Sequence, residues 1–396
     1  MSPAVVAPRP FLVVSEGLPI YSSGTSIILR RLLENFAPEE VVVIGRNPAP
    51  RLRLDSRRPR YPMIRIPSVP AGIRGERYWR LVSAFSGVMT GLRAIRRHRP
   101  TAIMAMFPYE SSLLTGYWLH LLTGLPLFSY FCDLYQEDTR TWWEARLAAW
   151  LQPRVFRASE RLMVVSEGMA EYYRERYGLE ALSVPACIND PVPEPGPIPS
   201  PSRSFIVGYS GNINNARLSS LRALVEAIGG DPAYEIRYFT PQTPEFLRAQ
   251  GLWADNASAA FVSDEADLLR RLSACDALFL PLTFEVGDYS RDQLATCFGT
   301  KSCEYFISRK PILLHCPGDY FIARFYRTWD CGLVVDGPEA SGLRSGLERL
   351  RSEGDLRARL VRNALRAASQ FQGSRVASIV RSMLGGATSG VGAPVT

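Results

Sequence analysis

Short apolar runs alternate with amphipathic helical patterns along most of this chain, and no other feature constrains its fold as strongly. Each run has the length and composition of a buried strand, and the segments between them carry apolar residues at helical spacing. Strand-like runs occur at residues 11–14, 41–44, 102–106, 127–131 and 162–165, and again at 205–209, 235–239, 259–262, 277–280, 311–314 and 333–335. This alternation predicts an α/β protein whose parallel sheets carry helices on both faces.

One proline-rich break interrupts the alternation, because neither a helix nor a central strand continues through repeated proline. The break predicts two Rossmann-like doubly wound domains that face each other across a cleft, where the carboxyl ends of their strands bind ligand. We expect an N-terminal domain (1–190), a linker (191–204), a second domain (205–355), C-terminal helices that pack back toward the first domain (356–384) and a disordered tail (385–396).

Lysine is almost absent: the chain has two lysines and 44 arginines, and both lysines fall within residues 298–312. Lys301 and Glu304 are at i, i+3 spacing and therefore share a helix face, behind a turn at Gly299. A helix start with a lysine attracts phosphate, and a carboxylate one turn later suits sugar hydroxyls. A chance pairing within an arginine-biased composition is the alternative.

Two loops have the composition of phosphate-binding turns. Gly211, Asn212 and Arg217 follow the first strand of the second domain, where small and polar residues let backbone N–H groups turn inward and the guanidinium reaches a phosphate. Gly24 holds the corresponding position in the first domain. Each loop taken alone is equally consistent with an ordinary strand-to-helix turn.

Several kinds of chemistry are excluded by missing motifs. The chain has no G-x-G-x-x-G fingerprint after its first strand, no complete P-loop and no D-x-D pair, so we expect neither a nicotinamide or flavin cofactor nor a metal ion. Seven cysteines without a C-x-x-C pair, and three histidines, give no zinc pattern and indicate free thiols in a reducing compartment. The N-terminus lacks a signal-peptide pattern, which predicts a cytoplasmic protein.

Positive charge is concentrated between residues 46 and 99, where 14 arginines face two acidic residues, a local excess of 14 − 2 = 12. Within this region Leu81, Phe85, Val88, Leu92 and Ile95 recur at helical spacing. Such a helix can lie on an anionic membrane surface, or it can be a core-facing helix with a solvated arginine face. No nucleic-acid-binding motif is present. The apolar stretch 113–132 is broken by glycine and proline, which favours a helix followed by a strand over a membrane span.

The second half of the chain resembles the donor-binding domain of GT-B glycosyltransferases of the family-4 type, which are retaining and use nucleotide sugars. The resemblance rests on Gly208-Tyr-Ser-Gly-Asn-Ile213 with Arg217, on 275–282, on Phe298-Gly-Thr-Lys-Ser-Cys-Glu304 and the residues that follow to 312, and on 331–335; residues 161–169 resemble the segment that closes the family's first domain. It implies that Glu304 binds ribose hydroxyls and that Lys301 and Arg217 bind the donor phosphates.

The resemblance further places the backbone of Phe298, Gly299 and Thr300 near the sugar and Gly24 near the distal phosphate. Two positions depart from the family pattern: Thr296 stands where the first of two glutamates is usual, and Asn212 where an arginine is usual. In the first domain Asp133 follows a strand at the position of the family's polar residue that faces the sugar. A carboxylate there can orient a hydroxyl or act as a base, or it can cap the next helix.

The expected function is transfer of a sugar from a nucleoside-diphosphate sugar to an acceptor hydroxyl with retention, without a metal. The acceptor class expected is a lipid-linked glycan of bacterial surface polysaccharide synthesis, with the protein peripheral on the inner face of the membrane through the basic region 46–99. Two other classes remain open: a nucleotide-sugar epimerase of the same fold, and a non-catalytic nucleotide-sugar-binding subunit.

Overall fold

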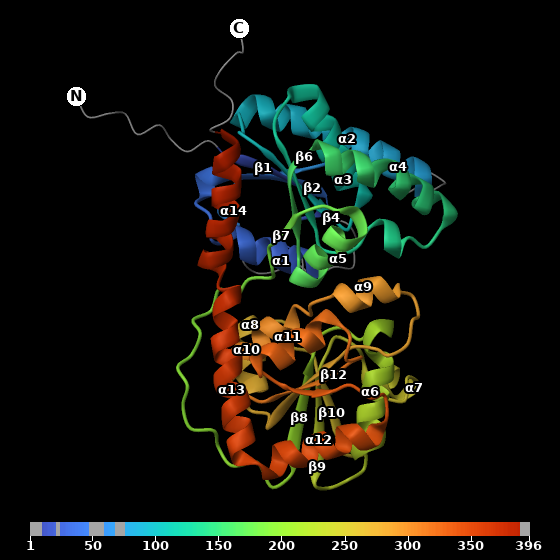
Figure 1. Cartoon of the computed structure of the whole chain (residues 1–396), viewed down its shortest axis with the longest axis vertical. Coiled ribbons are helices and arrows are strands. Elements are labelled where there is room, and N and C mark those ends of the chain that lie inside the picture. The colour runs from blue at the N-terminus through green and yellow to red at the C-terminus, as the bar shows by residue number, and fades with distance from the viewer. Residues whose placement is uncertain (1–9, 21–23, 47–58, 68–75, 389–396) are drawn as a thin grey trace, which may run out of the picture. The chain divides into compact units, whose positions relative to one another are not determined.

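The computed structural model describes residues 10–20, 24–46, 59–67 and 76–388, and the chain forms two compact units (Figure 1). Unit 1 comprises residues 1–189 together with 373–396, and unit 2 comprises 190–372. Each unit contains one parallel sheet with helices between its strands. The prediction of two Rossmann-like α/β domains is confirmed.

The sheet of unit 1 has seven parallel strands in the order β3-β2-β1-β4-β5-β6-β7. Its central strands are buried along their whole length, which explains why the sequence shows continuous apolar runs there rather than alternation. The strands are β1 (Phe11–Gly17), β2 (Val41–Arg46), β3 (Met63–Arg65), β4 (Ile103–Phe107), β5 (Leu127–Phe131), β6 (Ser159–Val164) and β7 (Ala181–Ser183). The short strands β3 and β7, at the two edges, have no counterpart among the predicted runs.

The helices of unit 1 connect these strands. They are α1 (Gly24–Leu33), α2 (Glu76–His98), α3 (Glu110–Thr123), α4 (Trp142–Ala158), α5 (Glu167–Tyr177) and α14 (Gly373–Thr388), with short 3-10 helices η1 (Pro38–Glu40) and η2 (Gln136–Asp138). The stretch 113–132 is a helix followed by a strand, as predicted: α3 ends at Gly124, in the left-handed region, and β5 begins after Pro126. None of the described helices is long and apolar enough to cross a membrane.

Helix α2 buries only part of the apolar stripe that its sequence predicts. Val88 is buried and Leu92 and Ile95 are half-buried, but Phe85 is 68% exposed, and the side chain of Leu81 lies outside the described residues. Small residues contribute to the buried face, because a Cβ atom on Gly87 would overlap the side chain of Thr115 and one on Gly91 would overlap Leu119. Close packing against α3 therefore requires glycine at these two positions of α2, and Phe85 remains outside.

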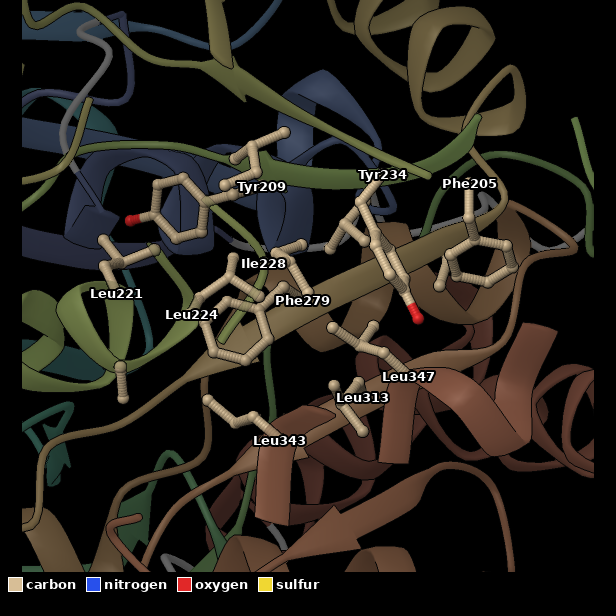
Figure 2. Close-up of a cluster of buried hydrophobic side chains, with 14 of the residues drawn as sticks. Phe205, Tyr209, Leu221, Leu224, Ile228, Tyr234, Phe279, Leu313, Leu343 and Leu347 are labelled. Atoms are coloured by element: carbon tan, nitrogen blue, oxygen red, sulfur yellow. The ribbon is translucent and has the colours of Figure 1, made fainter. Parts of the chain in front are cut away.

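The sheet of unit 2 has six parallel strands in the order β10-β9-β8-β11-β12-β13. Apolar side chains from these strands, from α6 and from α12 form its core, which Figure 2 shows. The strands are β8 (Phe205–Ser210), β9 (Tyr234–Phe239), β10 (Ala257–Ala260), β11 (Ala277–Pro281), β12 (Ile312–His315) and β13 (Leu333–Val335); the helices are α6 (Asn215–Ile228), α7 (Pro244–Ala249), α8 (Glu265–Ser273), α9 (Arg291–Thr296), α10 (Lys301–Ile307), α11 (Phe321–Trp329), α12 (Ala340–Ser352) and α13 (Gly354–Ala368), with η3 (Ser369–Phe371) after α13.

The predicted C-terminal helical segment 356–384 divides between the two units. Helix α13 packs against α10, α11 and α12 within unit 2, whereas α14 packs against α1 of unit 1. Arg381 of α14 forms an ion pair with Glu40 at 3.0 Å, donates to the carbonyl of Asn35 at 2.7 Å, and lies over the ring of Phe36. Helix α14 continues to Thr388, beyond the predicted start of the tail at residue 385, and residues 389–396 lie outside the described part.

A buried ion pair connects four elements at the carboxyl edge of the unit 1 sheet. Arg46, at the end of β2, lies 3.0 Å from Glu16 of β1, and both side chains are less than 5% exposed. The hydroxyl of Ser111 in α3 donates to Glu16 at 2.5 Å, and Arg46 donates to the carbonyl of Ser83 in α2 at 3.1 Å. Burial lowers the pKa of the Arg46 guanidinium, and the charge of Glu16 opposes that shift.

We expect Arg46→Met to destabilise unit 1 by about 3–5 kcal/mol, because it leaves the carboxylate of Glu16 buried without its counter-charge. The double variant Glu16→Gln/Arg46→Met should recover most of that loss, since no uncompensated charge remains. Urea unfolding followed by circular dichroism measures both. The control is Arg97→Met, an exposed arginine of α2, and a single variant no less stable than this control would contradict the prediction.

Candidate donor site

The strand order of unit 2 reverses at β8, whose neighbours β9 and β11 are reached by connections that run in opposite directions. In such sheets the carboxyl ends of the strands on either side of this point form the usual ligand-binding position. The residues there are Tyr209, Ser210 and Gly211 at the end of β8, and Leu282 and Thr283 after β11. The sequence-predicted residues Lys301 and Arg217 belong to α10 and α6 of the same unit.

Lys301 is held against the end of β8. Its ammonium group donates to the hydroxyl of Tyr209 at 3.1 Å and lies 4.7 Å from the centre of the Tyr209 ring, a cation–π distance. Tyr209 in turn donates to the carbonyl of Asn212 at 2.9 Å. Gly211 has φ +103°, and a Cβ atom there would overlap Cε and Nζ of Lys301. Glycine at 211 therefore supplies both the backbone conformation and the space that the lysine side chain occupies.

The surroundings of Lys301 disfavour its charged form. Burial lowers the pKa of this lysine well below its usual value, the positive charge of Arg217 lowers it further, and the carboxylate of Glu304 raises it only in part. Two neighbouring cations in a partly buried position repel each other. An anion between them would reverse the balance, because it would stabilise both charges at once.

Arg217 lies in the first turn of α6, and only part of its guanidinium group is hydrogen-bonded. Its Nη1 donates to the side chain of Asn214 at 3.1 Å, and its Nε is buried without a hydrogen-bond partner. Asn214 is held in turn by the hydroxyl of Tyr289, which accepts from it at 3.1 Å. The guanidinium therefore retains donor capacity at the carboxyl edge of the sheet.

Asn212, which occupies the position where the resembled family has an arginine, is exposed, and its side-chain oxygen accepts a hydrogen bond from Gln242. The backbone N–H of Ile213 donates to the same Gln242 side chain at 3.3 Å. Gln242 thus holds the loop after β8 in its observed conformation. No sequence pattern indicates this role, because Gln242 lies in the loop after a different strand, β9.

The turn before α10 differs from the prediction in two respects. Gly299 does not have positive φ, and a Cβ atom there would make only ordinary contacts at 3.9 Å, so the turn does not require glycine. The N–H groups of Ser302 and Cys303 donate to the carbonyls of Gly299 and Thr300 and are not free for an anion. With α10 only seven residues long, its backbone contributes less than predicted, and the side chains of Lys301 and Arg217 carry the positive charge.

The remaining predicted residues divide between the edge of the site and the core. Thr300 precedes α10 and makes no capping hydrogen bond with its side chain, and Glu304 is half-buried one turn after Lys301. The ring of Phe298 packs in the core, stacked on Phe371 at 5.2 Å, so that only its backbone is available to a ligand. Thr296 is buried, and its hydroxyl donates to the carbonyl of Asp292 in its own helix at 2.8 Å.

The second lysine has a different setting. Lys310 immediately precedes Pro311 and β12, at the amino end of that strand, whereas Lys301 lies at the carboxyl edge of the same sheet. Burial lowers the pKa of Lys310, and the carboxylate of Asp276 opposes this shift. The two lysines, which are close in sequence, therefore lie on opposite edges of unit 2.

In unit 1 the predicted residues lie at the carboxyl ends of the strands. Gly24 opens α1, is exposed, and has open space where a Cβ atom would be; residues 21–23 beside it lie outside the described part. Asp133 follows β5 and is half-buried. It does not cap α4, because Thr141 does so in a capping box with Glu144.

The sequence did not single out Tyr109, which follows β4 at the point where the strand order of unit 1 reverses. Burial raises the pKa of Tyr109, and the negative charges of Glu16 and Asp133 raise it further, so that three polar groups from β1, β4 and β5 act on one another at this edge. A tyrosine after a strand has no distinctive spacing, which is why only the fold reveals the group.

Glu137, close to Asp133 in the chain, accepts a hydrogen bond from the hydroxyl of Tyr177, which also accepts from Gln152 at 3.0 Å. These contacts fix the segment after β5 against α4 and α5.

Among the described residues no group of three or more histidine, cysteine or acidic side chains is placed to hold a metal ion. All seven cysteines are free.

Residues 23–184 match the family model described as a glycosyl transferase 4-like domain. This region of unit 1 is therefore similar to a glycosyl transferase 4-like domain. The match covers most of unit 1, including the segment from Gly24 through Asp133. No curated protein matches the chain at the sequence level.

Solved structures match both units together. Sucrose-phosphate synthase from Thermosynechococcus elongatus has a TM-score of 0.71 and 15% identity over 96% of this chain and 99% of its own. Anabaena HepE in complex with UDP has a TM-score of 0.68 and 14% identity, covering 96% and 100%. α,α-Trehalose 6-phosphate synthase from Burkholderia multivorans has a TM-score of 0.64 and 12% identity, covering 98% and 100%. At these identities the matches establish the fold, which is GT-B.

The pKa of Lys301 predicts that anion binding takes up a proton. In the free protein the lysine is neutral above its lowered pKa, and a bound polyanion raises that pKa, so between the two values the complex holds more protons. The affinity for inorganic pyrophosphate should therefore fall as pH rises through this window, by up to about tenfold per pH unit.

Isothermal titration calorimetry in buffers of different ionisation enthalpy measures this uptake directly. Lys301→Met is the control, because it removes this one ionisable side chain and leaves the ionisation of pyrophosphate itself unchanged. Equal proton uptake by the wild type and this variant would contradict the assignment of the proton to Lys301.

Proposed function

We propose that this protein is a glycosyltransferase that moves a sugar from a nucleoside-diphosphate sugar to an acceptor hydroxyl with retention of anomeric configuration. The observation that carries the proposal is the pair formed by Lys301 and Arg217 at the carboxyl edge of unit 2. Arg217 contributes to the lowered pKa of the lysine, and its own Nε is buried without a partner. A diphosphate supplies the charge that both groups lack.

The class of donor is supported by the matched structures as well as by the site. HepE has been crystallised with UDP, with UDP-glucose, and with UDP and glucose. We propose that Glu304, one turn after Lys301, accepts hydrogen bonds from the ribose hydroxyls of a comparable nucleotide. The backbone of Phe298, Gly299 and Thr300 would adjoin the sugar, with Gly211 and Asn212 along the phosphates and Gly24 near the distal phosphate.

The proposed mechanism needs no protein nucleophile. The departing diphosphate, stabilised by Lys301 and Arg217, accepts the proton of the acceptor hydroxyl on the face that the leaving group vacates, and the new bond forms on that face. Protein groups then act by positioning and by stabilising charge that develops in the transition state. Asp133 is the proposed group that orients the acceptor or sugar hydroxyl; the N-cap of α4 is Thr141.

The proposed acceptor is a glycan carried on a lipid diphosphate, as in bacterial surface polysaccharide synthesis. Its support is the net charge of +12 in residues 46–99, which suits a reaction at the inner face of an anionic membrane. Within that region the exposed arginines 60, 65, 93, 96, 97 and 99 are described, whereas residues 47–58 and 68–75 lie outside the described part.

We expect Lys301→Ala to lower turnover about 10²–10³-fold, the usual effect of removing one group that stabilises developing charge. Folding should change little, because the substitution removes a charge that its surroundings disfavour. Release of nucleoside diphosphate from a panel of donor sugars measures turnover, and thermal unfolding measures stability.

The chain provides a matched control in Lys310→Ala, which removes the other lysine at the opposite edge of the sheet. Near-normal turnover in Lys301→Ala, or an equal loss in both variants, would refute the assignment. The products separate the rival functions: transfer or slow donor hydrolysis indicates a transferase, interconversion of the donor sugar an epimerase, and binding alone a non-catalytic subunit.

We further propose that the reaction needs no divalent metal, since Lys301 and Arg217 supply the positive charge at the phosphates. Turnover should be unchanged after treatment with EDTA. The measurement is the same nucleotide-release assay with and without chelator, and activity lost with EDTA and restored by magnesium would overturn this part of the proposal.

A further inference from the structure

Exposed apolar side chains gather on one helical layer of unit 1. Twelve large apolar side chains are exposed in the described part of the chain, and eight of them lie on α2, α3 and α4. Helix α2 packs on α3 and α3 on α4, and Figure 1 shows the three helices grouped together. We call their outer face the α2–α4 surface; its exposed apolar residues are Val82, Phe85, Met89, Trp118, Leu121, Leu122, Trp142 and Trp150.

The arrangement on α2 is that of an amphipathic helix whose apolar side points outward. Val82, Phe85 and Met89 are at i, i+3 and i+7, which places them on one face, and they are 41%, 68% and 39% exposed. The opposite face packs on α3 through Gly87 and Gly91. Val82, Phe85 and Met89 therefore lie outside the core of unit 1.

Helices α3 and α4 add tryptophan and leucine to the same layer. Trp118, Leu121 and Leu122 occupy the last turns of α3 and are 44%, 52% and 59% exposed, and Trp142 at the start of α4 is 63% exposed. Soluble monomers rarely expose so many large apolar groups on adjacent elements without a partner. Tryptophan is enriched where an apolar phase meets water, because its ring is apolar and its N–H is polar.

Beyond the first turn of each helix, the charged side chains of this layer are all positive. The acidic residues of the three helices are Glu76, Glu110 and Glu144, all in first turns, and every later charged residue is basic. The exposed arginines of the layer are Arg93, Arg96 and Arg97 on α2, and Arg146 and Arg157 on α4. None of these five forms an ion pair with another described residue.

We infer that the α2–α4 surface binds an anionic lipid bilayer at its interface. The exposed tryptophans and leucines enter the boundary between head groups and acyl chains, and the arginines bind lipid phosphates while their aliphatic stems lie along the apolar groups. Arg93 and Arg96 continue the stripe of Met89 at i+4 and i+7. Every charge of this layer beyond the first helical turns is positive, which complements the uniform negative charge of an anionic lipid surface, so a bilayer is the occupant that these charges match.

This inference does not depend on the donor chemistry, and it changes where the membrane contact lies. The sequence placed the contact in the basic region 46–99, of which α2 forms only the end. The structure adds α3 and α4, which carry three of the exposed tryptophans and lie outside that region. Three parallel crossover helices present a broad surface rather than a single helical anchor.

The test is co-sedimentation of the full chain with sucrose-loaded vesicles of phosphatidylcholine alone or with about one-third phosphatidylglycerol, in about 0.1 M salt. Wild-type protein should bind the anionic vesicles. Phe85→Glu/Leu122→Glu, at two strongly exposed positions, should reduce binding at least tenfold. The triple variant Arg93→Ala/Arg96→Ala/Arg97→Ala should reduce it about 100-fold, from the usual contribution of each basic residue near an anionic surface.

Two controls match these variants. Phe246→Glu changes an exposed apolar residue of α7 in unit 2, and Arg248→Ala/Arg270→Ala/Arg349→Ala removes the same charge from arginines of unit 2 that form ion pairs. Both should bind vesicles like wild type. Equal losses in the controls would show that the effect is total charge or general hydrophobicity, and would overturn the inference.

Analytical ultracentrifugation and nucleotide titration separate the remaining outcomes. If wild type fails to bind either vesicle, or if it self-associates and Phe85→Glu/Leu122→Glu abolishes that association instead, the surface is not a bilayer-binding site. Binding of a nucleoside diphosphate, titrated in parallel, should be unaffected by the surface variants. If the wild-type protein did not bind a nucleoside diphosphate, the proposed donor site would be wrong, and the result of the vesicle experiment would be unaffected.

Discussion

The ammonium group of Lys301 is the charge around which unit 2 is arranged at its carboxyl edge. The side chain fits there only because Gly211 lacks a Cβ atom, and it is held by the hydroxyl and ring of Tyr209. Tyr209 also belongs to the hydrophobic core shown in Figure 2, so the position of the charge is tied to the packing of the sheet. The lysine side chain, with an arginine as neighbour, is thus positioned for an anion before the anion arrives.

The strands were predictable because a parallel sheet covered on both faces needs continuous apolar runs, and these are visible in the sequence. The pairing of Lys301 with Glu304 was predictable for a similar reason, since helical spacing is local. The role of Tyr209 was not: it reaches Lys301 across 92 positions of sequence, and it does so only once β8 and α10 are packed together. Likewise the amides of Ser302 and Cys303 turned inward to the preceding carbonyls, a choice of hydrogen-bond partner that spacing cannot reveal.

The burial of side chains on α2 is a second property that the sequence pattern did not predict. Its apolar positions repeat at helical spacing, and a pattern of this kind normally marks the face that packs on the core. Here Gly87 and Gly91 allow α3 to approach so closely that the small residues form the buried face, and Phe85 is left outside. The sequence shows which residues of a helix are apolar. Which of these are buried depends on how closely the neighbouring helix approaches, and small residues such as Gly87 and Gly91 determine that distance.

The division of the chain into units has a consequence for the order in which it folds. Unit 2 is one continuous segment, 190–372, inserted between the two pieces of unit 1. The N-terminal piece therefore leaves the ribosome without α14, whose Arg381 pairs with Glu40 and covers Phe36. Its partner surface on α1 stays open until α14 has been made, whereas unit 2 can complete its core first. In this chain the domain synthesised second can be the first one finished.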